Sequence, residues 1–195
     1  THQVEFIEVD LSCRQSTEAC LNALKKRQLD FAGVVSNAGQ GIFGQLESHS
    51  TEAIYKGIDL NFTAHVMLAR AVLPEMKRRG SGCLVFMGSE AALEGARNGS
   101  VYCATKFALR GLAQSLRADV ASSGVRVSIV HPGMVKTGFF DELWFSPGKE
   151  AGQYLTAADV ARTVWHILDA PAGMVIDEVK VSPQVKVVTF DRKKR

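Results

Sequence analysis

The chain lacks the features that mark membrane, metal-binding and disulfide-rich proteins. No stretch of its 195 residues reaches the roughly 18 consecutive apolar residues of a membrane-spanning helix. Its four cysteines form no Cys-x-x-Cys pair, and its five histidines form no His-x-x-x-His or Cys/His group. The sequence therefore predicts no membrane segment and no metal site. It favours reduced, buried thiols over disulfides or metal ligands.

A strong excess of one charge is also lacking. The net charge is +3, and the only dense basic run is residues 192–195 at the end of the chain. Such a run is typical of a solvated tail, and a contact with nucleic acid or a lipid surface is the alternative. Residues 1–10 carry acids where a signal peptide would carry cations and an apolar run. We therefore expect a cytoplasmic protein with no nucleic-acid or membrane partner.

What the sequence does contain is a regular alternation of strand and helix patterns. With 46% hydrophobic residues, the chain has the composition of one soluble domain over residues 1–195. Helices are expected at residues 51–79, at residues 100–123 and from Thr156 onward. Short apolar runs predict strands between and around them, at residues 4–9, 31–36, 83–87, 125–130 and 175–181. This order predicts an α/β fold with a doubly wound, Rossmann-like parallel sheet.

Ligands of such sheets bind at the carboxyl ends of the strands, so the residues that follow each predicted strand are candidates for the site. Several of them are polar or are turn formers that expose the backbone. They are Asp10, Asn37-Ala38-Gly39, Ser89 and His131-Pro132-Gly133.

A glycine motif in this region has the wrong context for a dinucleotide fingerprint. Gly39, Gly41 and Gly44 follow a predicted strand as G-x-G-x-x-G, and Asp59 lies about twenty residues further on. In the fingerprint, however, the last glycine already lies inside a helix, whereas here five residues separate Gly44 from the predicted helix cap at Ser50. We interpret the motif as a loop that lets backbone approach a ligand.

A set of residues across the chain resembles the short-chain dehydrogenase/reductase family in order and spacing. Tyr102 and Lys106 are four residues apart, and Ser89 lies 102 − 89 = 13 residues before the tyrosine. The remaining motif residues are Ser36-Asn37-Ala38-Gly39, Asn61, Pro132-Gly133 and Thr137. The resemblance implies an oxidoreductase that uses NADP or NAD to interconvert an alcohol and a carbonyl.

The tyrosine and lysine make chemical sense as a pair. Reducing a carbonyl requires a proton donor at the forming alkoxide, and the reverse reaction requires the same group as a base. A free tyrosine has a pKa of about 10, so useful basicity near neutral pH requires about 4 kcal/mol of help. One cation about 4 Å away can supply that much. Lys106 lies one helical turn from Tyr102 and can be that cation. A surface tyrosine beside a solvated lysine is the alternative.

Two further residues complete the catalytic set that the resemblance implies. Ser89 follows an apolar strand, where its hydroxyl would donate to the substrate oxygen as charge develops. Asn61 lies within the predicted helix 51–79, and by resemblance it helps hold a water that links Lys106 to solvent. The alternatives are an ordinary turn serine and a polar residue tolerated on a wet helix face.

The resemblance also implies a cofactor site and an apolar substrate. Lys106 would bond to the nicotinamide ribose, and the region of Val135 and Thr137 would contact the carboxamide. The other cofactor contacts would be Asp10, Asn37, Ala38, Gly39, Tyr102, Pro132 and Gly133, although Pro132-Gly133 could also be a simple turn. Aromatic residues then form the segment that corresponds to the family's substrate lid. Phe139, Phe140, Leu143, Trp144 and Phe145 favour an apolar alcohol or carbonyl substrate, or they pack the lid closed.

The chain has no counterpart of the family's N-terminal T-G-x-x-x-G-x-G loop. Two strand–helix units, about 60 residues, would restore an ordinary family length. We therefore expect an N-terminally incomplete sheet, belonging either to a fragment or to a shortened product whose first residues pair differently. Two functional hypotheses follow. One is an oxidoreductase, and the other is a non-catalytic interaction protein. By resemblance, either would form a homodimer or homotetramer through helices 51–79 and 100–123.

Overall fold

A parallel sheet forms the centre of the domain. The computed structural model describes residues 4–27, 31–191 and 193, so most of the basic run 192–195 lies outside the described residues. Within that part of the chain, four parallel strands pair in the order β1-β2-β3-β5. Their bounds are β1 (Gly33–Ser36), β2 (Gly82–Met87), β3 (Val125–Pro132) and β5 (Glu178–Val181).

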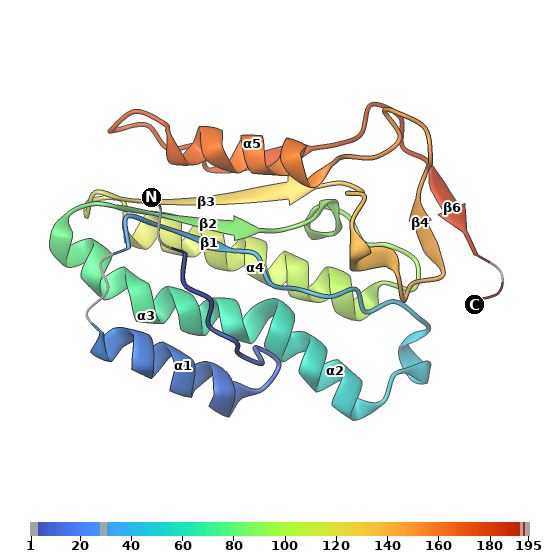
Figure 1. The fold of residues 1–195 in the computed structure, drawn as a ribbon, viewed down its shortest axis with the longest axis horizontal. Coiled ribbons are helices and arrows are strands. Elements are labelled where there is room, and N and C mark those ends of the chain that lie inside the picture. The colour runs from blue at the N-terminus through green and yellow to red at the C-terminus, as the bar shows by residue number, and fades with distance from the viewer. Residues whose placement is uncertain (1–3, 28–30, 192, 194–195) are drawn as a thin grey trace.

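Helices cover both faces of this sheet. Helix α5 lies on one face, and the other helices lie on the opposite face (Figure 1). The predicted doubly wound, Rossmann-like fold is confirmed. The helices are α1 (Arg14–Lys26), α2 (Thr51–Ile58), α3 (Ala64–Arg79), α4 (Ser100–Asp119) and α5 (Ala157–Leu168).

The side chains of β2 show how the two faces are packed. Successive residues of a strand point to opposite faces. Leu84 and Phe86 accordingly join the cluster formed with α3 and α4, while Val85 and Met87 pack against α5 around Ile167. Burying a side chain of this size contributes roughly 1.5–3 kcal/mol. The near-continuous apolar run of β2 therefore holds both helix layers to one strand.

The long helix predicted at residues 51–79 is present as three continuous helical segments. The Ser50 side chain caps α2 by accepting a hydrogen bond from the backbone N–H of Ala53 at 3.1 Å. A π-helical segment, Asp59–Thr63, then joins α2 to α3. Such π-bulges frequently occur at functional sites, and this one contains Asn61.

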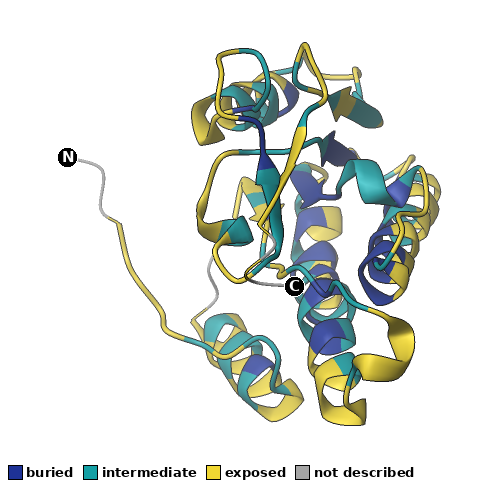
Figure 2. Ribbon diagram, turned by 90° about the vertical axis from the view of Figure 1, so that its right-hand side faces the viewer, coloured by how far each residue is buried: buried dark blue, intermediate teal, exposed yellow. Residues whose placement is uncertain are grey.

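Several sequence-based predictions of elements are wrong, and β1 begins at Gly33 instead of residue 31. The helix predicted at 100–123 ends at Asp119 and continues as turns to Gly124, whose φ of +74° suits glycine. The strand predicted at residues 175–181 is β5, which begins at Glu178 instead of residue 175. Residues 4–9 form no strand and stand away from the sheet as an exposed segment (Figure 2). A strand requires a partner for its backbone groups, and none of the described strands pairs with this segment.

A small antiparallel ribbon lies beyond the carboxyl ends of the main strands (Figure 1). It consists of β4 (Phe145–Pro147) and β6 (Val188–Phe190), with Phe145 opposite Phe190. The ribbon brings the C-terminal region beside the aromatic segment that precedes it by about 40 residues. Over the described part of the chain, no helix is both long and apolar enough to cross a bilayer.

Candidate active site

A cavity of about 1620 Å³ opens at the carboxyl ends of the sheet strands. Most of the residues that the sequence singled out line it. These are Asn37, Gly39, Ser89, Tyr102, Lys106, Pro132, Gly133, Val135 and Thr137.

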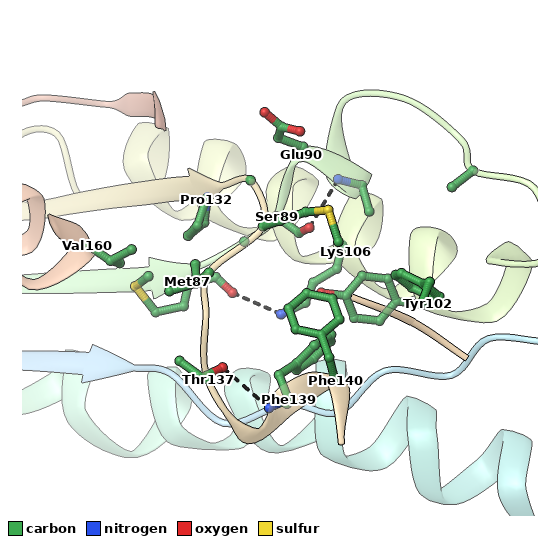
Figure 3. A pocket seen from close by; sticks show the side chains of 18 of the residues that line it. Met87, Ser89, Glu90, Tyr102, Lys106, Pro132, Thr137, Phe139, Phe140 and Val160 are labelled. Atoms are coloured by element: carbon green, nitrogen blue, oxygen red, sulfur yellow. Dashed lines mark hydrogen bonds between the residues drawn. The ribbon is translucent and has the colours of Figure 1, made fainter. Parts of the chain in front are cut away.

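Helix α4 places Tyr102 and Lys106 on its buried face. Only 6% of the tyrosine and 4% of the lysine are exposed, so the alternative of a surface tyrosine beside a solvated lysine is wrong. The lysine Nζ lies 5.8 Å from the centre of the Tyr102 ring. Its ammonium group donates a hydrogen bond of 3.0 Å to the backbone carbonyl of Met87 at the end of β2 (Figure 3).

Burial is the main cause of the pKa shifts of both Tyr102 and Lys106. For Tyr102, the shift is opposite to the lowering that the sequence predicted. Burial raises the pKa of Tyr102 to about 12, and a hydrogen bond with Ser89 only partly opposes this. The expected lowering by Lys106 is therefore not seen. Removal from water disfavours the phenolate. The same effect lowers the pKa of Lys106 to about 8, because its ammonium form is also desolvated.

Ser89 lies at the start of the turn after β2, with its hydroxyl at the cavity beside Tyr102 (Figure 3). Its Oγ accepts a hydrogen bond of 3.1 Å from the backbone N–H of Ala91. The turn-serine interpretation is thus correct as local structure. It does not conflict with the catalytic prediction, because a hydroxyl group can accept one bond and still donate another.

Asn61 holds the loop that follows β1. Its Oδ1 accepts from the backbone N–H of Gln40, and its Nδ2 donates to the backbone carbonyl of the same residue, both at 2.9 Å. The side chain is fully buried, so the alternative of a polar residue on a wet helix face is wrong. A side chain that bonds both backbone groups of one residue fixes that residue's position. Asn61 therefore shapes the cavity wall without lining the cavity.

The backbone of the glycine-rich loop lies close to the side chains of Asn61 and Lys106. A Cβ added at Gly39 would lie 3.3 Å from the Asn61 Oδ1 and 3.5 Å from the Lys106 Nζ. Helix α2 does not begin until Thr51, well after Gly44. The loop thus lacks the helix N-terminus of a dinucleotide fingerprint, and Gly39 keeps the space beside the lysine open.

An aromatic wall faces Tyr102. Phe43 and Phe139 pack against the Tyr102 ring in tilted arrangements, with centroid distances of 5.0 and 5.9 Å. Trp144 and Phe190 stack nearly parallel at 5.5 Å, across the β4–β6 ribbon. Phe43 and Phe190 were not predicted from the sequence. Phe43 could have been suspected from its place in the glycine-rich loop, whereas nothing local marks Phe190.

Two predicted cofactor residues do not line the cavity. Asp10 is exposed and accepts hydrogen bonds from the backbone and hydroxyl of Ser12. Ala38 directs its carbonyl to the His65 side chain instead. Their roles stay predictions. Among the described residues, no three His, Cys, Asp or Glu side chains group as a metal site would require.

Comparison with known proteins agrees with this geometry. Residues 1–146 match the family model for short chain dehydrogenases. The 17-beta-hydroxysteroid dehydrogenase type 1 of Mus musculus is 37% identical over 145 residues, which cover 74% of this chain and 42% of that protein. Retinol dehydrogenase 8 of Bos taurus is 38% identical over 136 residues, covering 70% of this chain and 43% of that protein.

A solved structure extends the likeness to the fold. The alcohol dehydrogenase of the archaeon Thermococcus sibiricus, complexed with 5-hydroxy-NADP, has a TM-score of 0.77 and 29% identity. The match covers 89% of this chain and 72% of that one. The chain belongs to the short-chain dehydrogenase/reductase family. It spans less than half the length of the curated relatives described above.

Proposed function

We propose that this chain carries the catalytic part of an NAD(P)-dependent oxidoreductase that interconverts an alcohol and a carbonyl. The observation that carries the proposal is the convergence of Ser89, Tyr102 and Lys106 in one cavity. A tyrosine and lysine in helical register, buried beside a serine hydroxyl, are costly to desolvate. A protein that served only as a scaffold would have no use for them.

The cavity residues fit a nicotinamide cofactor. The space beside Gly39, which a Cβ would partly fill, borders the Lys106 ammonium group. One of the three N–H donors of that group bonds to Met87, which leaves two to offer a ribose hydroxyl. Another part of the cavity is lined by residues that follow or end β3. These are Pro132, Gly133, Val135 and Thr137. When bound, the nicotinamide would supply or accept the hydride. Relatives solved with NADP or its analogue support NADP, with NAD as the other candidate.

Each side chain has a separate task in the proposed reaction. Tyr102, with its pKa raised to about 12, is protonated at neutral pH and can donate to the carbonyl oxygen as that oxygen gains charge. Ser89 donates a second hydrogen bond to the same oxygen. In the reverse direction Tyr102 must lose its proton, and we assign Lys106, whose Nζ lies 5.8 Å from the centre of the ring, as the cation that stabilises the resulting phenolate.

An apolar substrate fits the aromatic wall. Phe139, Phe140 and Phe190 line the cavity with Tyr102, and aromatic faces of this kind bind apolar rings and chains. The names of the relatives, a hydroxysteroid dehydrogenase and a retinol dehydrogenase, support the same class of substrate. We therefore propose a bulky apolar alcohol or carbonyl.

A direct binding titration tests the proposal. The fluorescence of the purified 195-residue chain would be titrated with NADPH and with NADH, followed by turnover assays on apolar alcohols and ketones. We expect saturable binding of one of the two cofactors. An absence of both binding and turnover would refute the catalytic proposal.

A second proposal concerns self-association. Tyr55 on α2 and Phe107 on α4 are 58% and 43% exposed, and the two helices contact each other. Large exposed apolar side chains on neighbouring helices favour an interface. We propose a homodimer or homotetramer through residues 51–79 and 100–123, a role that the non-catalytic alternative would also use. Sedimentation of the chain and of a Tyr55→Glu/Phe107→Glu variant would test it, and an unchanged oligomeric state would refute it.

A further inference from the structure

The turn that carries Ser89 is held at three successive residues by groups of two elements, α4 and β3. The carbonyl of Met87 accepts from Lys106 of α4 at 3.0 Å. The N–H of Gly88 donates to the carbonyl of Val130 on β3 at 2.7 Å. The carbonyl of Ser89 itself lies 3.1 Å from the Nδ1 atom of a histidine, described next. These contacts add to two bonds within the turn, from the Ala91 N–H to the Ser89 Oγ at 3.1 Å and from the Ala92 N–H to the Ser89 carbonyl at 2.9 Å.

The third contact comes from His131 on β3, a fully buried side chain. A carbonyl oxygen only accepts hydrogen bonds, so the Nδ1 of His131 must carry the proton that binds the Ser89 carbonyl. The ring packs closely on the turn as well, because a Cβ added at Gly88 would lie 2.5 Å from the same Nδ1. The ring thus contacts the turn at two adjacent residues, Gly88 and Ser89.

Glu178 and Arg110, which form an ion pair, lie on the other side of the His131 ring. The Nε2 of His131 lies 2.8 Å from the Oε1 of Glu178 on β5, without the alignment of a hydrogen bond. The Arg110 Nε lies 2.7 Å from the same carboxylate oxygen. Arg110 belongs to α4, one helical turn beyond Lys106. The chain of contacts therefore begins and ends on the helix that carries the proposed catalytic residues.

We infer that His131 is a positioning residue that orients Ser89 through its Nδ1–H, and that Glu178 and Arg110 hold the ring in place for this purpose. The inference rests on the proposed function of Ser89. It adds a second route, besides Lys106, by which α4 controls the geometry of the turn after β2. A displacement of about 1 Å at a catalytic group can cost on the order of 100-fold in rate, so the orientation of this carbonyl matters for the adjacent hydroxyl.

A matched pair of variants separates orientation from simple packing. In His131→Asn the amide nitrogen can take the place of Nδ1 and keep the bond to Ser89. In His131→Gln the amide nitrogen reaches the place of Nε2, towards Glu178, and the bond to Ser89 is lost. We expect kcat to fall about 10-fold or more in His131→Gln and within about threefold in His131→Asn, with the Kd for NADPH within about twofold in both.

A measurement on the wild-type chain tests the geometry without activity. Nitrogen-15 chemical shifts of the histidine ring report which nitrogen carries a proton, and we expect a protonated Nδ1 in His131 at pH 7.5 without cofactor. A bare Nδ1 would overturn the inference, even if neither variant folds. Equal losses of kcat in both variants, or none in either, would overturn it as well. A failure of the proposed function is distinguishable, because the wild-type chain itself would then show neither NADPH binding nor turnover.

Discussion

The ammonium group of Lys106 on α4 donates a 3.0 Å hydrogen bond to the backbone carbonyl of Met87 at the end of β2. This contact fastens the helix that carries the proposed acid to the strand that precedes Ser89. It also places a cation where only 4% of the residue is exposed. The lysine is thus positioned at the expense of its hydration, which explains its lowered pKa.

Replacing this lysine should separate stability from function. The pKa of Lys106 falls from 10.5 to about 8, which corresponds to roughly 3 kcal/mol of destabilisation by the buried charge at pH 7. Removing the buried charge should therefore stabilise the fold, and losing the hydrogen bond to Met87 should offset about 1 kcal/mol of that stabilisation. We therefore expect Lys106→Met to be more stable than the wild type at pH 7 and to bind NADPH more weakly.

Urea unfolding at several pH values would check this prediction. The unfolded chain holds the lysine proton up to pH 10.5, whereas the folded chain releases it near pH 8. The stability advantage of Lys106→Met should therefore shrink as the pH rises from 8 to 10.5. Lys149→Met, at an exposed position, serves as the control and should show no such trend. A Lys106→Met variant less stable than the wild type at pH 7 would contradict the argument.

A second pH dependence should come from His65 on α3. Its Nε2 lies 3.0 Å from the Ala38 carbonyl, its Nδ1 lies 2.6 Å from the Ser36 hydroxyl, and burial lowers its pKa from 6.5 to about 4. The unfolded chain therefore binds a proton between pH 6.5 and 4 that the folded chain does not. Stability present above pH 6.5, roughly 3 kcal/mol, should be lost as the pH falls through 4.

The His65 prediction would be checked by urea midpoints at pH 7 and pH 4.5. His65→Gln should be less stable at pH 7, because its hydrogen bonds change, yet lose less stability on acidification. The exposed His166→Gln provides the control. An acid dependence of His65→Gln as steep as that of the wild type would mean that another group is responsible.

The role of Tyr102 is testable by removing one oxygen atom. Tyr102→Phe should keep the ring packing with Phe43 and Phe139, and hence the fold, while turnover falls by at least about 100-fold. The exposed Tyr55→Phe should be unchanged. Circular dichroism and steady-state rates with the same substrate would make the comparison. Residual turnover above a few per cent in Tyr102→Phe would exclude it as the acid.

Gly88 should tolerate no side chain. A Cβ there would lie 2.5 Å from the His131 Nδ1 and 3.1 Å from the Val130 carbonyl. Gly88→Ala should therefore cost about 1–3 kcal/mol of stability and reduce turnover by displacing Ser89. A Cβ at Gly95 has open space, so Gly95→Ala should have little effect. Thermal unfolding of both variants would decide, and equal effects would contradict the packing argument.

The aromatic ribbon should determine affinity for apolar substrates. Phe190 stacks on Trp144 across β4 and β6 and lines the cavity. Phe190→Ala should raise the KM for a bulky apolar alcohol by about 10-fold, consistent with the burial energy of an aromatic side chain, and leave kcat for a small alcohol little changed. Phe6→Ala, 92% exposed outside the cavity, is the control. An unchanged KM would favour the interpretation that these rings merely pack the lid closed.

The sequence predicted the central sheet well because its signals are local. The apolar runs of β2 and β3 are long enough to identify as buried strands, and the helix caps at Ser50 and Thr156 are confirmed, the latter with Asp159 as a capping box. The run at residues 4–9 also contains β-branched and aromatic residues but has no pairing partner, so it forms no strand. Composition expresses a strand propensity, whereas hydrogen bonding to a neighbour decides the outcome.

The candidate site divides in the same way. The sequence by itself determined which chemical groups are available and that Tyr102 and Lys106 share a helix face, because helical geometry follows from residue spacing. Only the tertiary structure brought Phe190 to the site, since the pairing of β6 with the distant strand β4 places it there. It also decided the protonation of the site, raising the pKa of Tyr102 and lowering that of Lys106. Both shifts arise because packing of remote elements removes water, and no local pattern of residues records how much water is removed.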